Sequence, residues 1–297
     1  MTIWNHYYLP STLDEAIELL NQTPGSARVI AGGTDLLLDL QQGRHAPVDT
    51  LVDVNQVREM LVLEMRGTHL FIGASVPLNQ ITTSELVLEH AQALSEASGL
   101  IGGPQVRNTG TLGGNVAHAL PAADGTISIM ALNAEVEIAS AQGLRRQALN
   151  TLFLGPGKSA LDPHGEIISG FYLPVRKANQ ASGFSRIMRP QGVALPVINM
   201  AAWLERDGDR IQDIRIAVGP SGPIPQRITA AEDALRGRPY NEESLSDGLK
   251  AMLNSVKFRT SPQRATAEYR QKLAGVLLRE VIQKVWQRAG GPVSHVV

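Results

Sequence analysis

The sequence contains 297 residues, a length that favours two or three packed units over one core, and its 43% hydrophobic and 19% charged residues predict a chain that folds. The formal net charge of −1 provides no global field that would attract nucleic acid, so a nucleic-acid partner is not expected. The absence of cysteine excludes disulfides, thiolate catalysis and cysteine-ligated iron–sulfur or zinc sites within this chain.

The N-terminal region begins with a segment that has neither the basic nor the apolar part of a signal peptide. No run reaches the roughly 18 apolar residues that a membrane-spanning helix needs, so we expect a cytoplasmic protein without a membrane span. Thr12 and Glu15 then form a capping-box pattern before apolar residues at helical spacing, which predicts a helix over 12–22. A short buried strand is expected over 28–31, and it runs directly into a Gly-Gly turn.

The middle of the chain alternates short strand-like runs with helical stretches, which is a mixed α/β pattern. The expected strands span 51–54, 69–75, 135–140 and 166–174, and the expected helices span 77–98 and 123–133. A polar stretch over 176–182 is the best candidate for a linker, and a weaker boundary lies over 54–58.

The last third is expected to contain strands followed by helices. Between residues 199 and 219, Asp207 and Gly208 separate two strand-like runs, which predicts a hairpin because glycine accepts the positive φ of a tight turn. Apolar residues then repeat at three- and four-residue steps over 273–285, which predicts a helix with one apolar stripe.

Two glycine-rich segments are candidates for a binding site. Gly32 and Gly33 follow a predicted strand, so their amides could form a concave nest for an anionic oxygen, with the Thr34 hydroxyl as a further donor. A simple tight turn is the alternative. The segment 101–126 has six glycines, two prolines and no usable amphipathic period, which favours backbone contact with a ligand; a long surface loop is the alternative.

Two polar residues in the second segment each have two possible roles. Asp124 stands where a helix is expected to begin, so its carboxylate could cap that helix or accept hydrogen bonds from a sugar or flavin. His118 could be a loop histidine or a proton relay. Neither segment has the GxxxxGK or GxGxxG spacing, so phosphate contact would come from backbone amides, which favours a bound dinucleotide over a hydrolysed triphosphate.

Four segments in consistent order carry a resemblance to a known family: AGGTDLL at 31–37, GGPQVRNTGTLGGNVAHALPAAD at 102–124, FLGPGKSALDPHGEII at 153–168 and RATAEYR at 264–270. They resemble the FAD-binding medium subunit of molybdenum hydroxylases, the family of xanthine, carbon monoxide, nicotinate and aldehyde dehydrogenases. The resemblance implies an α+β protein: a vanillyl-alcohol-oxidase (PCMH)-type FAD-binding domain of two α/β subdomains, and a C-terminal α+β domain with a small antiparallel sheet and helices. The implied units are 1–56, 57–176 and 177–297.

The resemblance also implies that FAD is the only cofactor and that the two glycine segments hold its diphosphate. Gly32, Gly33 and Thr34 would lie at the phosphates, Asp124 near the ribose or ribityl chain, and Ile101 beside the isoalloxazine. The backbone groups of Ile167 and Ile168, in the strand expected over 166–174, would contact the adenine end. The full set of implied FAD contacts is Val29, Ile30, Ala31, Gly32, Gly33, Thr34, Asp35, Leu36, Ile101, Gly110, Thr111, Gly114, Asn115, Ala117, Asp124, Ile167 and Ile168.

One position departs from the pattern of the family. Many relatives have a lysine one residue after the phenylalanine of the segment that reads GFSRIMRP here, and this chain has Ser185 there. If that lysine contacts the flavin, Arg186 could take over its task, or the contact could be absent.

The resemblance implies an oxidoreductase subunit that carries electrons and has no catalytic acid, catalytic base or metal ligand of its own. Electrons would pass from two [2Fe-2S] clusters of a small subunit through FAD to an acceptor such as NAD, after substrate is hydroxylated on a molybdopterin-binding large subunit, within a dimer of heterotrimers. A free-standing FAD-dependent oxidoreductase of the same fold and a non-catalytic scaffold subunit are the alternatives.

Overall fold

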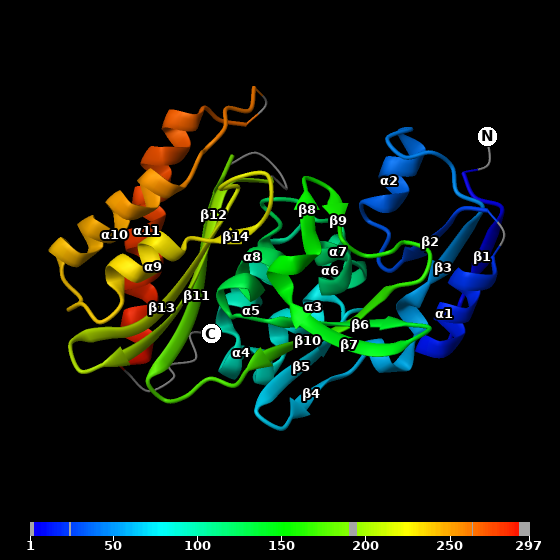
Figure 1. The fold of residues 1–297 in the computed structure, drawn as a ribbon, viewed down its shortest axis with the longest axis horizontal. Coiled ribbons are helices and arrows are strands. Elements are labelled where there is room, and N and C mark those ends of the chain that lie inside the picture. The colour runs from blue at the N-terminus through cyan, green and yellow to red at the C-terminus, as the bar shows by residue number, and fades with distance from the viewer. Residues whose placement is uncertain (1–2, 24, 190–194, 263, 291–297) are drawn as a thin grey trace.

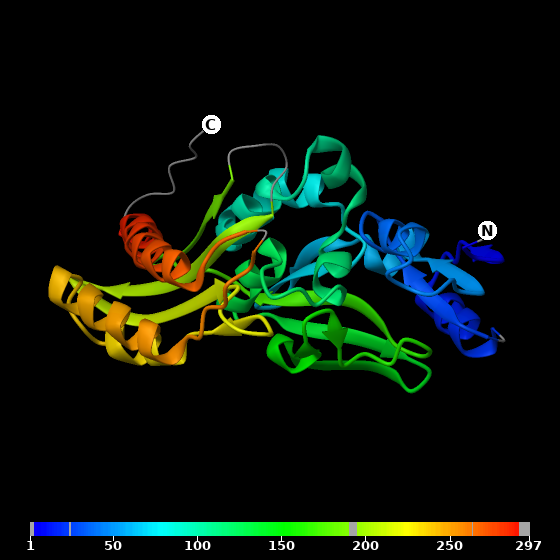
Figure 2. The same ribbon diagram turned by 90° about the horizontal axis from the view of Figure 1, so that it is seen from above.

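The computed structural model describes residues 3–23, 25–189, 195–262 and 264–290, and its parts follow one another along the long axis of the molecule (Figures 1 and 2). The N-terminal part lies at one end and the C-terminal helices lie at the other. No described helix is long and apolar enough to cross a membrane. Separate helical layers and antiparallel sheets give the α+β architecture that was expected.

The N-terminal part is a three-stranded parallel sheet in the order β1-β3-β2. Thr12 caps its first helix, since the Thr12 hydroxyl accepts a hydrogen bond from the Glu15 amide at 3.3 Å. The Glu15 carboxylate accepts in turn from the Ser11 amide at 2.7 Å. In the standard capping box this donor is the amide of the N-cap residue, here Thr12, so the predicted box is completed by the amide one residue earlier. The elements are β1 (His6–Tyr8), α1 (Leu13–Gln22), β2 (Ala27–Ile30), α2 (Leu36–Gln41), β3 (Thr50–Asp53) and the short 3-10 turns η1 (Val54–Gln56) and η2 (Arg58–Met60).

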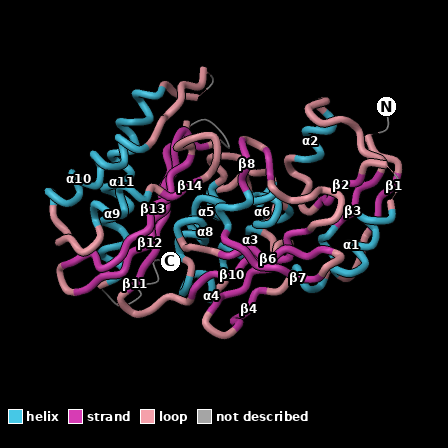
Figure 3. The backbone as a smooth tube through the Cα atoms, viewed as in Figure 1, coloured by secondary structure: helices cyan, strands magenta, loops and turns pink. Residues whose placement is uncertain are grey.

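The central part is a five-stranded antiparallel sheet in the order β4-β5-β10-β6-β7, with helices beside it (Figure 3). Its strands are β4 (Leu63–Arg66), β5 (His69–Gly73), β6 (Glu135–Ser140), β7 (Gly143–Ala148) and β10 (Ile167–Pro174), and a small ladder pairs β8 (Phe153–Gly155) with β9 (Lys158–Ser159) after the turn η3 (Leu149–Leu152). Its helices are α3 (Leu78–Thr83), α4 (Glu85–His90), α5 (Gln92–Leu100), α6 (Pro104–Thr109), α7 (Leu112–Ala117) and α8 (Asp124–Ala131).

The helical stretch expected over 77–98 forms as three short helices, because Ser84 ends α3 and caps α4 through its hydroxyl, and Ala91 leaves helical geometry before α5 begins. The long loop that was the alternative for 101–126 is not formed. Instead, α6 and α7 lie within that stretch, and their packing against other elements replaces the missing amphipathic period.

The C-terminal part is a four-stranded antiparallel sheet in the order β11-β12-β13-β14, backed by three helices. The predicted hairpin forms, and Gly208 takes the positive φ of +56° in its turn. The connection before the sheet is shorter than the expected linker, because β11 already begins at residue 180. The elements are β11 (Gln180–Met188), β12 (Pro196–Asp207), β13 (Arg210–Gly219), β14 (Gln226–Arg227), α9 (Thr229–Leu235), α10 (Glu242–Ser255) and α11 (Ala267–Ala289).

Both faces of the C-terminal sheet are buried, and alternate residues of each strand serve different cores. On β12, Ala201 and Trp203 pack with the central part of the molecule, whereas Ala202 and Leu204 pack with the helices of the C-terminal part. In Figure 1, α9, α10 and α11 cover the outer face of this sheet, and α5 and α8 lie on its inner side. The sheet therefore forms part of two hydrophobic cores.

Candidate functional site

The first glycine segment lies at the carboxyl end of the parallel sheet, directly after β2. Ligands of α/β sheets bind at this end of the strands. Gly33 has a φ of +64°, a conformation that favours glycine, so the turn requires this residue type. The Asn55 amide donates to the Ala31 carbonyl at 2.8 Å and fixes the start of the turn. Residues 31–34 are all partly exposed.

The two glycine segments touch through their backbones. A Cβ atom at Gly32 would lie 2.2 Å from the Thr109 carbonyl oxygen and 2.7 Å from the Gly110 Cα. Because neither backbone atom can swing away as a flexible side chain could, Gly32 has to be glycine for this contact to form. The structure thus places the first glycine turn directly against residues 109 and 110 of the second segment.

The glycines of the second segment differ in exposure: Gly110, Gly113 and Gly125 are buried, Gly102 and Gly103 are partly exposed, and Gly114 is exposed. A Cβ atom at Gly113 would lie 2.6 Å from Ala74, so this glycine serves close packing. Gly114 is exposed, and its amide is held by the hydroxyl of Thr111, which accepts it at 3.0 Å as the cap of α7. Gly110 and Thr111 are buried, while Ala117 is exposed one turn after Gly114.

Asn115 and Asp124 are held within the protein. The Asn115 side-chain oxygen accepts from the Thr126 amide at 3.0 Å and from its hydroxyl at 3.2 Å, so it fixes the start of α8. The capping role considered for Asp124 is wrong, because Ala123 is the N-cap of α8 and the Asp124 side chain makes no capping hydrogen bond. The carboxylate points instead toward the C-terminal sheet.

The Asp124 carboxylate is bound by two residues of that sheet. Arg186 on β11 pairs with one oxygen at 2.5 Å, and the Asn199 amide on β12 donates to the other at 2.5 Å. Asp124 is 4% exposed. Burial raises the pKa of Asp124 above its ordinary value, and the Arg186 charge opposes that rise. The Arg186 Nε and the Asn199 side-chain oxygen are buried without a partner, so this polar cluster retains unused hydrogen-bonding capacity.

Ser185 and Arg186 lie on opposite faces of β11. The Ser185 hydroxyl faces α11, where it donates to Glu280 at 2.8 Å and accepts from Lys284 at 3.1 Å. Arg186 faces the central part through Asp124. Ser185 itself is therefore directed away from the second glycine segment, and Arg186 is directed toward it.

Ile101 lies in a turn that an unpredicted residue holds in place. Arg107 donates from Nη1 to the Ile101 carbonyl at 3.2 Å and to the Gly102 carbonyl at 2.8 Å. Gly102 has a φ of +55°, and Ile101 is partly exposed. The only sequence signal for Arg107 was its position inside the glycine-rich run, because its acceptors are main-chain atoms that leave no pattern of residue types.

Ile167 and Ile168 begin β10, and both residues are buried. They pair with β6, and β5 begins its pairing only at Gly170. The Ala74 backbone connects this strand to the glycine segment, since its amide donates to the Ser169 carbonyl at 3.0 Å and its carbonyl accepts from the Gly113 amide at 2.9 Å. Main-chain hydrogen bonds thus join Ser169 and Gly113, the immediate neighbours of the predicted site residues Ile168 and Gly114.

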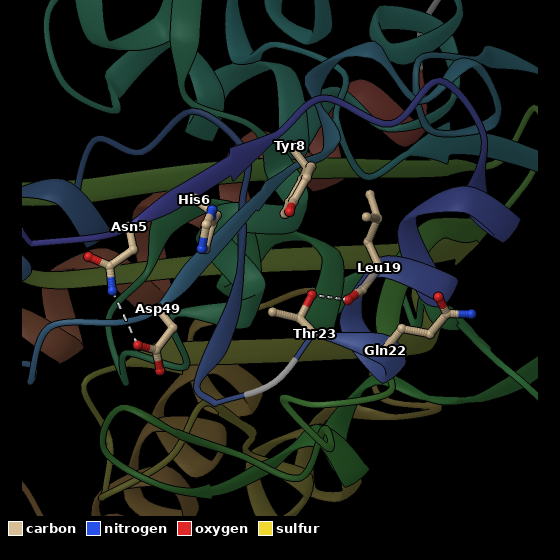
Figure 4. A pocket seen from close by; sticks show the side chains of 7 residues that line it. All are labelled: Asn5, His6, Tyr8, Leu19, Gln22, Thr23 and Asp49. Atoms are coloured by element: carbon tan, nitrogen blue, oxygen red, sulfur yellow. Dashed lines mark hydrogen bonds between the residues drawn. The ribbon is translucent and has the colours of Figure 1, made fainter.

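A surface hollow of about 390 Å³ lies elsewhere, between β1 and α1 (Figure 4). It is near the amino ends of the parallel strands, where the Asn5 amide donates to the Asp49 carboxylate at 3.4 Å. Hydrogen bonds from Ser26 lower the pKa of Asp49. The glycine turn lies at the opposite, carboxyl end of the sheet, so this hollow is separate from the candidate site. Among the described residues, no cluster of histidine, aspartate or glutamate could hold a metal ion.

Two family models match the chain in sequence. Residues 3–176 match the FAD binding domain in molybdopterin dehydrogenase, and residues 183–285 match the CO dehydrogenase flavoprotein C-terminal domain. The chain is 32% identical over 296 residues to the putative xanthine dehydrogenase FAD-binding subunit XdhB of Escherichia coli (strain K12), covering 97% of this chain and 98% of that protein. It is 33% identical over 283 residues to the nicotine 6-hydroxylase medium subunit of Paenarthrobacter nicotinovorans, covering 95% of this chain and 97% of that subunit.

Solved structures agree with these sequence matches. Carbon monoxide dehydrogenase from Hydrogenophaga pseudoflava superposes with a TM-score of 0.90 at 27% identity, covering 96% of this chain and 98% of the matched chain. Quinoline 2-oxidoreductase from Pseudomonas putida 86 superposes with a TM-score of 0.88 at 27% identity and the same coverage. The chain therefore belongs to the family of FAD-binding subunits of the molybdenum hydroxylases, it is an oxidoreductase component, and FAD is its cofactor.

Proposed function

We propose that this chain passes electrons from [2Fe-2S] clusters of a partner subunit through FAD to an external acceptor such as NAD. The observation that carries the proposal is the backbone contact of Gly32 with Thr109 and Gly110, which creates one continuous cradle from two distant segments. A cradle of this kind suits a cofactor with a diphosphate, because main-chain amides without side chains allow close approach of phosphate oxygens.

The residues present fit FAD at this cradle. Gly32, Gly33 and Thr34 are partly exposed at the carboxyl end of the sheet, and Gly114 is exposed at the start of α7. We assign to the site the whole set expected from sequence: Val29, Ile30, Ala31, Gly32, Gly33, Thr34, Asp35, Leu36, Ile101, Gly110, Thr111, Gly114, Asn115, Ala117, Asp124, Ile167 and Ile168. Bound FAD supplies an electron carrier, while the task of these residues is to hold and orient it.

Asp124 has a further task in this proposal. One of its carboxylate oxygens binds Arg186 and the other accepts from Asn199. Each oxygen keeps a further lone pair, and a ribose or ribityl hydroxyl would donate to it. The C-terminal sheet would then fix the position of a cofactor-binding side chain on α8. This arrangement gives Arg186 a positioning role, one residue after Ser185, which stands where relatives have a lysine.

The partners in this proposal are a [2Fe-2S] small subunit and a molybdopterin-binding large subunit, in a cytoplasmic dimer of heterotrimers. The relatives are named as medium chains or medium subunits, and one is named as subunit alpha of a 6-hydroxypseudooxynicotine dehydrogenase complex. The sequence has no cysteine, so iron–sulfur clusters held by thiolates have to come from another chain.

We propose the unit boundaries that the sequence suggested, 1–56, 57–176 and 177–297. Each unit then contains one of the three larger sheets, because the parallel sheet ends at Asp53, the five-stranded sheet spans 63–174 and the C-terminal sheet begins at Gln180.

Substitution of Gly114 by valine tests cofactor binding. A Cβ atom at Gly114 would meet only the Thr111 hydroxyl, at 3.3 Å, so the fold can accept the change while the exposed surface of this residue is covered. We expect Gly114→Val to lower the flavin content of the purified complex, measured by absorbance in the visible range after extraction, and to leave the partner subunits bound. Gly222→Val is the matched control, because its Cβ would meet only the Gln226 side chain at 3.4 Å.

The outcomes separate the three functions. Loss of flavin with intact assembly supports the relay function. Unchanged flavin content in Gly114→Val, in a complex that still assembles, contradicts the assignment of Gly114 to the FAD site, whereas a native complex that purifies without flavin supports the scaffold alternative. Turnover of a small substrate by the purified chain, without partner subunits, supports the free-standing enzyme.

A further inference from the structure

The 3-10 turn η1 follows β3 at the same edge of the parallel sheet at which the first glycine turn follows β2. These two strands are parallel neighbours, and Ile30 at the end of β2 lies opposite Asp53 at the end of β3. The glycine turn and η1 therefore begin next to each other at the carboxyl end of the sheet. The residues of η1 are outside the set assigned to FAD, so any role of η1 in cofactor binding has to come from what it holds.

Asn55 connects η1 to the first glycine turn. Its side-chain amide donates to the Ala31 carbonyl at 2.8 Å. Its main-chain amide donates to the Asp53 carboxylate at 2.8 Å and so caps η1. The other oxygen of this carboxylate accepts from the Tyr7 hydroxyl, and Asp53 is only 6% exposed. Asn55 is thus held by residues of β1 and β3 while its side chain holds the glycine turn.

Val54 connects η1 to the second glycine segment. Its carbonyl accepts from the Ser75 hydroxyl at 2.9 Å, and both residues are buried. The residue before Ser75 is Ala74, whose carbonyl accepts from the Gly113 amide at 2.9 Å. Because Val54 and Asn55 are consecutive in the chain, η1 holds both halves of the glycine cradle through adjacent residues.

We propose that Asn55 and Asp53 are positioning residues for FAD, which act through Ala31 to keep the first glycine turn aligned with the second segment. The proposal rests on the assignment of these two segments to FAD. Main-chain amides bind a diphosphate well only when their relative positions are already fixed, because otherwise binding has to order them. Without the anchor on Ala31, the first turn has to be ordered by the cofactor itself, and affinity for FAD falls.

Titration of FAD into the deflavinated full chain, followed by flavin fluorescence, tests the proposal. Asn55→Asp replaces the amide donor by an oxygen that faces the Ala31 carbonyl. We expect the Kd for FAD to rise about tenfold or more, as loss of one buried hydrogen bond does. Asn21→Asp is the matched control, because the Asn21 amide donates to the Ile17 carbonyl at 2.9 Å on α1, a helix that ends beside the surface hollow at the opposite end of the sheet. This control should bind FAD as the unchanged chain does.

Asp53 offers a conservative variant and a disruptive one. Asp53→Asn keeps a side-chain oxygen for the Asn55 amide and should keep most of the affinity for FAD. Asp53→Ala leaves that amide without its acceptor and should weaken FAD binding as Asn55→Asp does. In the FAD-free chain, amide hydrogen exchange over 31–34 should rise in Asn55→Asp and Asp53→Ala, while exchange in the C-terminal sheet stays unchanged and shows that the variants are folded.

Gly114→Val in the same titration separates this proposal from the assignment of the FAD site. The positioning role is overturned if Asn55→Asp binds FAD as tightly as Asn21→Asp does, or if Asp53→Asn and Asp53→Ala weaken binding equally. If Gly114→Val still weakens binding in that case, the assigned site stands and only the positioning role falls. Unweakened binding by both Gly114→Val and Asn55→Asp overturns the positioning role together with the assignment of Gly114.

Discussion

Replacement of Arg186 by methionine should destabilise the protein strongly, because it leaves a buried carboxylate without its counter-charge. Arg186 and Asp124 have side chains that are only 6% and 4% exposed and lie 2.5 Å apart. Removal of one partner of a buried ion pair costs about 3–5 kcal/mol, since the remaining charge is poorly solvated. We expect a loss of that size in the free energy of unfolding, measured by urea denaturation with circular dichroism and tryptophan fluorescence.

The pH dependence of this loss has a definite sign. Burial already raises the folded-state pKa of Asp124 above its unfolded value, and removal of Arg186 raises it further. The folded protein then binds more protons than the unfolded chain, so stability is greatest below the unfolded pKa and falls as pH rises through the folded pKa. The defect of Arg186→Met should therefore shrink in acid and grow toward neutral pH.

Two controls decide whether this reasoning holds. Arg145 pairs with Glu166 at 2.9 Å on the surface, with 43% of its side chain exposed, so Arg145→Met should cost at most about 1 kcal/mol. Adding Asp124→Asn to Arg186→Met removes the stranded charge and should recover much of the stability. The explanation fails if Arg186→Met is no more harmful than Arg145→Met, or if Asp124→Asn brings no recovery.

Three further predictions concern other parts of the site. Gly32→Ala should lower the free energy of unfolding by about 1–3 kcal/mol and reduce flavin content, because its Cβ would lie 2.2 Å from the Thr109 carbonyl oxygen; unchanged urea midpoints would contradict this. Arg107→Gln should increase amide hydrogen exchange over 101–103, since it loses two main-chain acceptors, while exchange in the N-terminal sheet stays the same. Burial raises the pKa of Tyr7 to about 12 and also raises the pKa of Tyr240. Ultraviolet titration should therefore show tyrosines that titrate late, and Tyr7→Phe should remove the part of that signal near pH 12. The stability that Tyr7 contributes is present below its unfolded pKa near 10 and is lost as pH rises through about 12.

Local patterns predicted the elements whose cause is local. The strand over 135–140 has the predicted bounds, and the hairpin at Gly208 forms where the sequence places a residue that accepts positive φ. The cap at Thr12 forms because hydroxyl and amide are three residues apart on one chain. These features require no knowledge of the remainder of the molecule.

Features that arise from tertiary contacts were not predictable in the same way. Asp124 has the residue type and position of a helix cap, yet Arg186 and Asn199, more than 60 residues later in the chain, bind its carboxylate instead. The need for glycine at residue 32 depends on a carbonyl of residue 109. The family resemblance supplied the association of the two glycine segments, but only the folded chain shows that they touch.

The C-terminal sheet, buried on both faces, has a consequence for how the protein can be divided. Ending the chain before β11 would expose the apolar surfaces of α5 and α8 that pack against the sheet. It would also leave the Asp124 carboxylate without Arg186 at the new surface. The first 176 residues should consequently aggregate or lose their cofactor when produced alone, although they match a family model by themselves. Removing the third part therefore takes away one hydrophobic core completely and exposes the other to water.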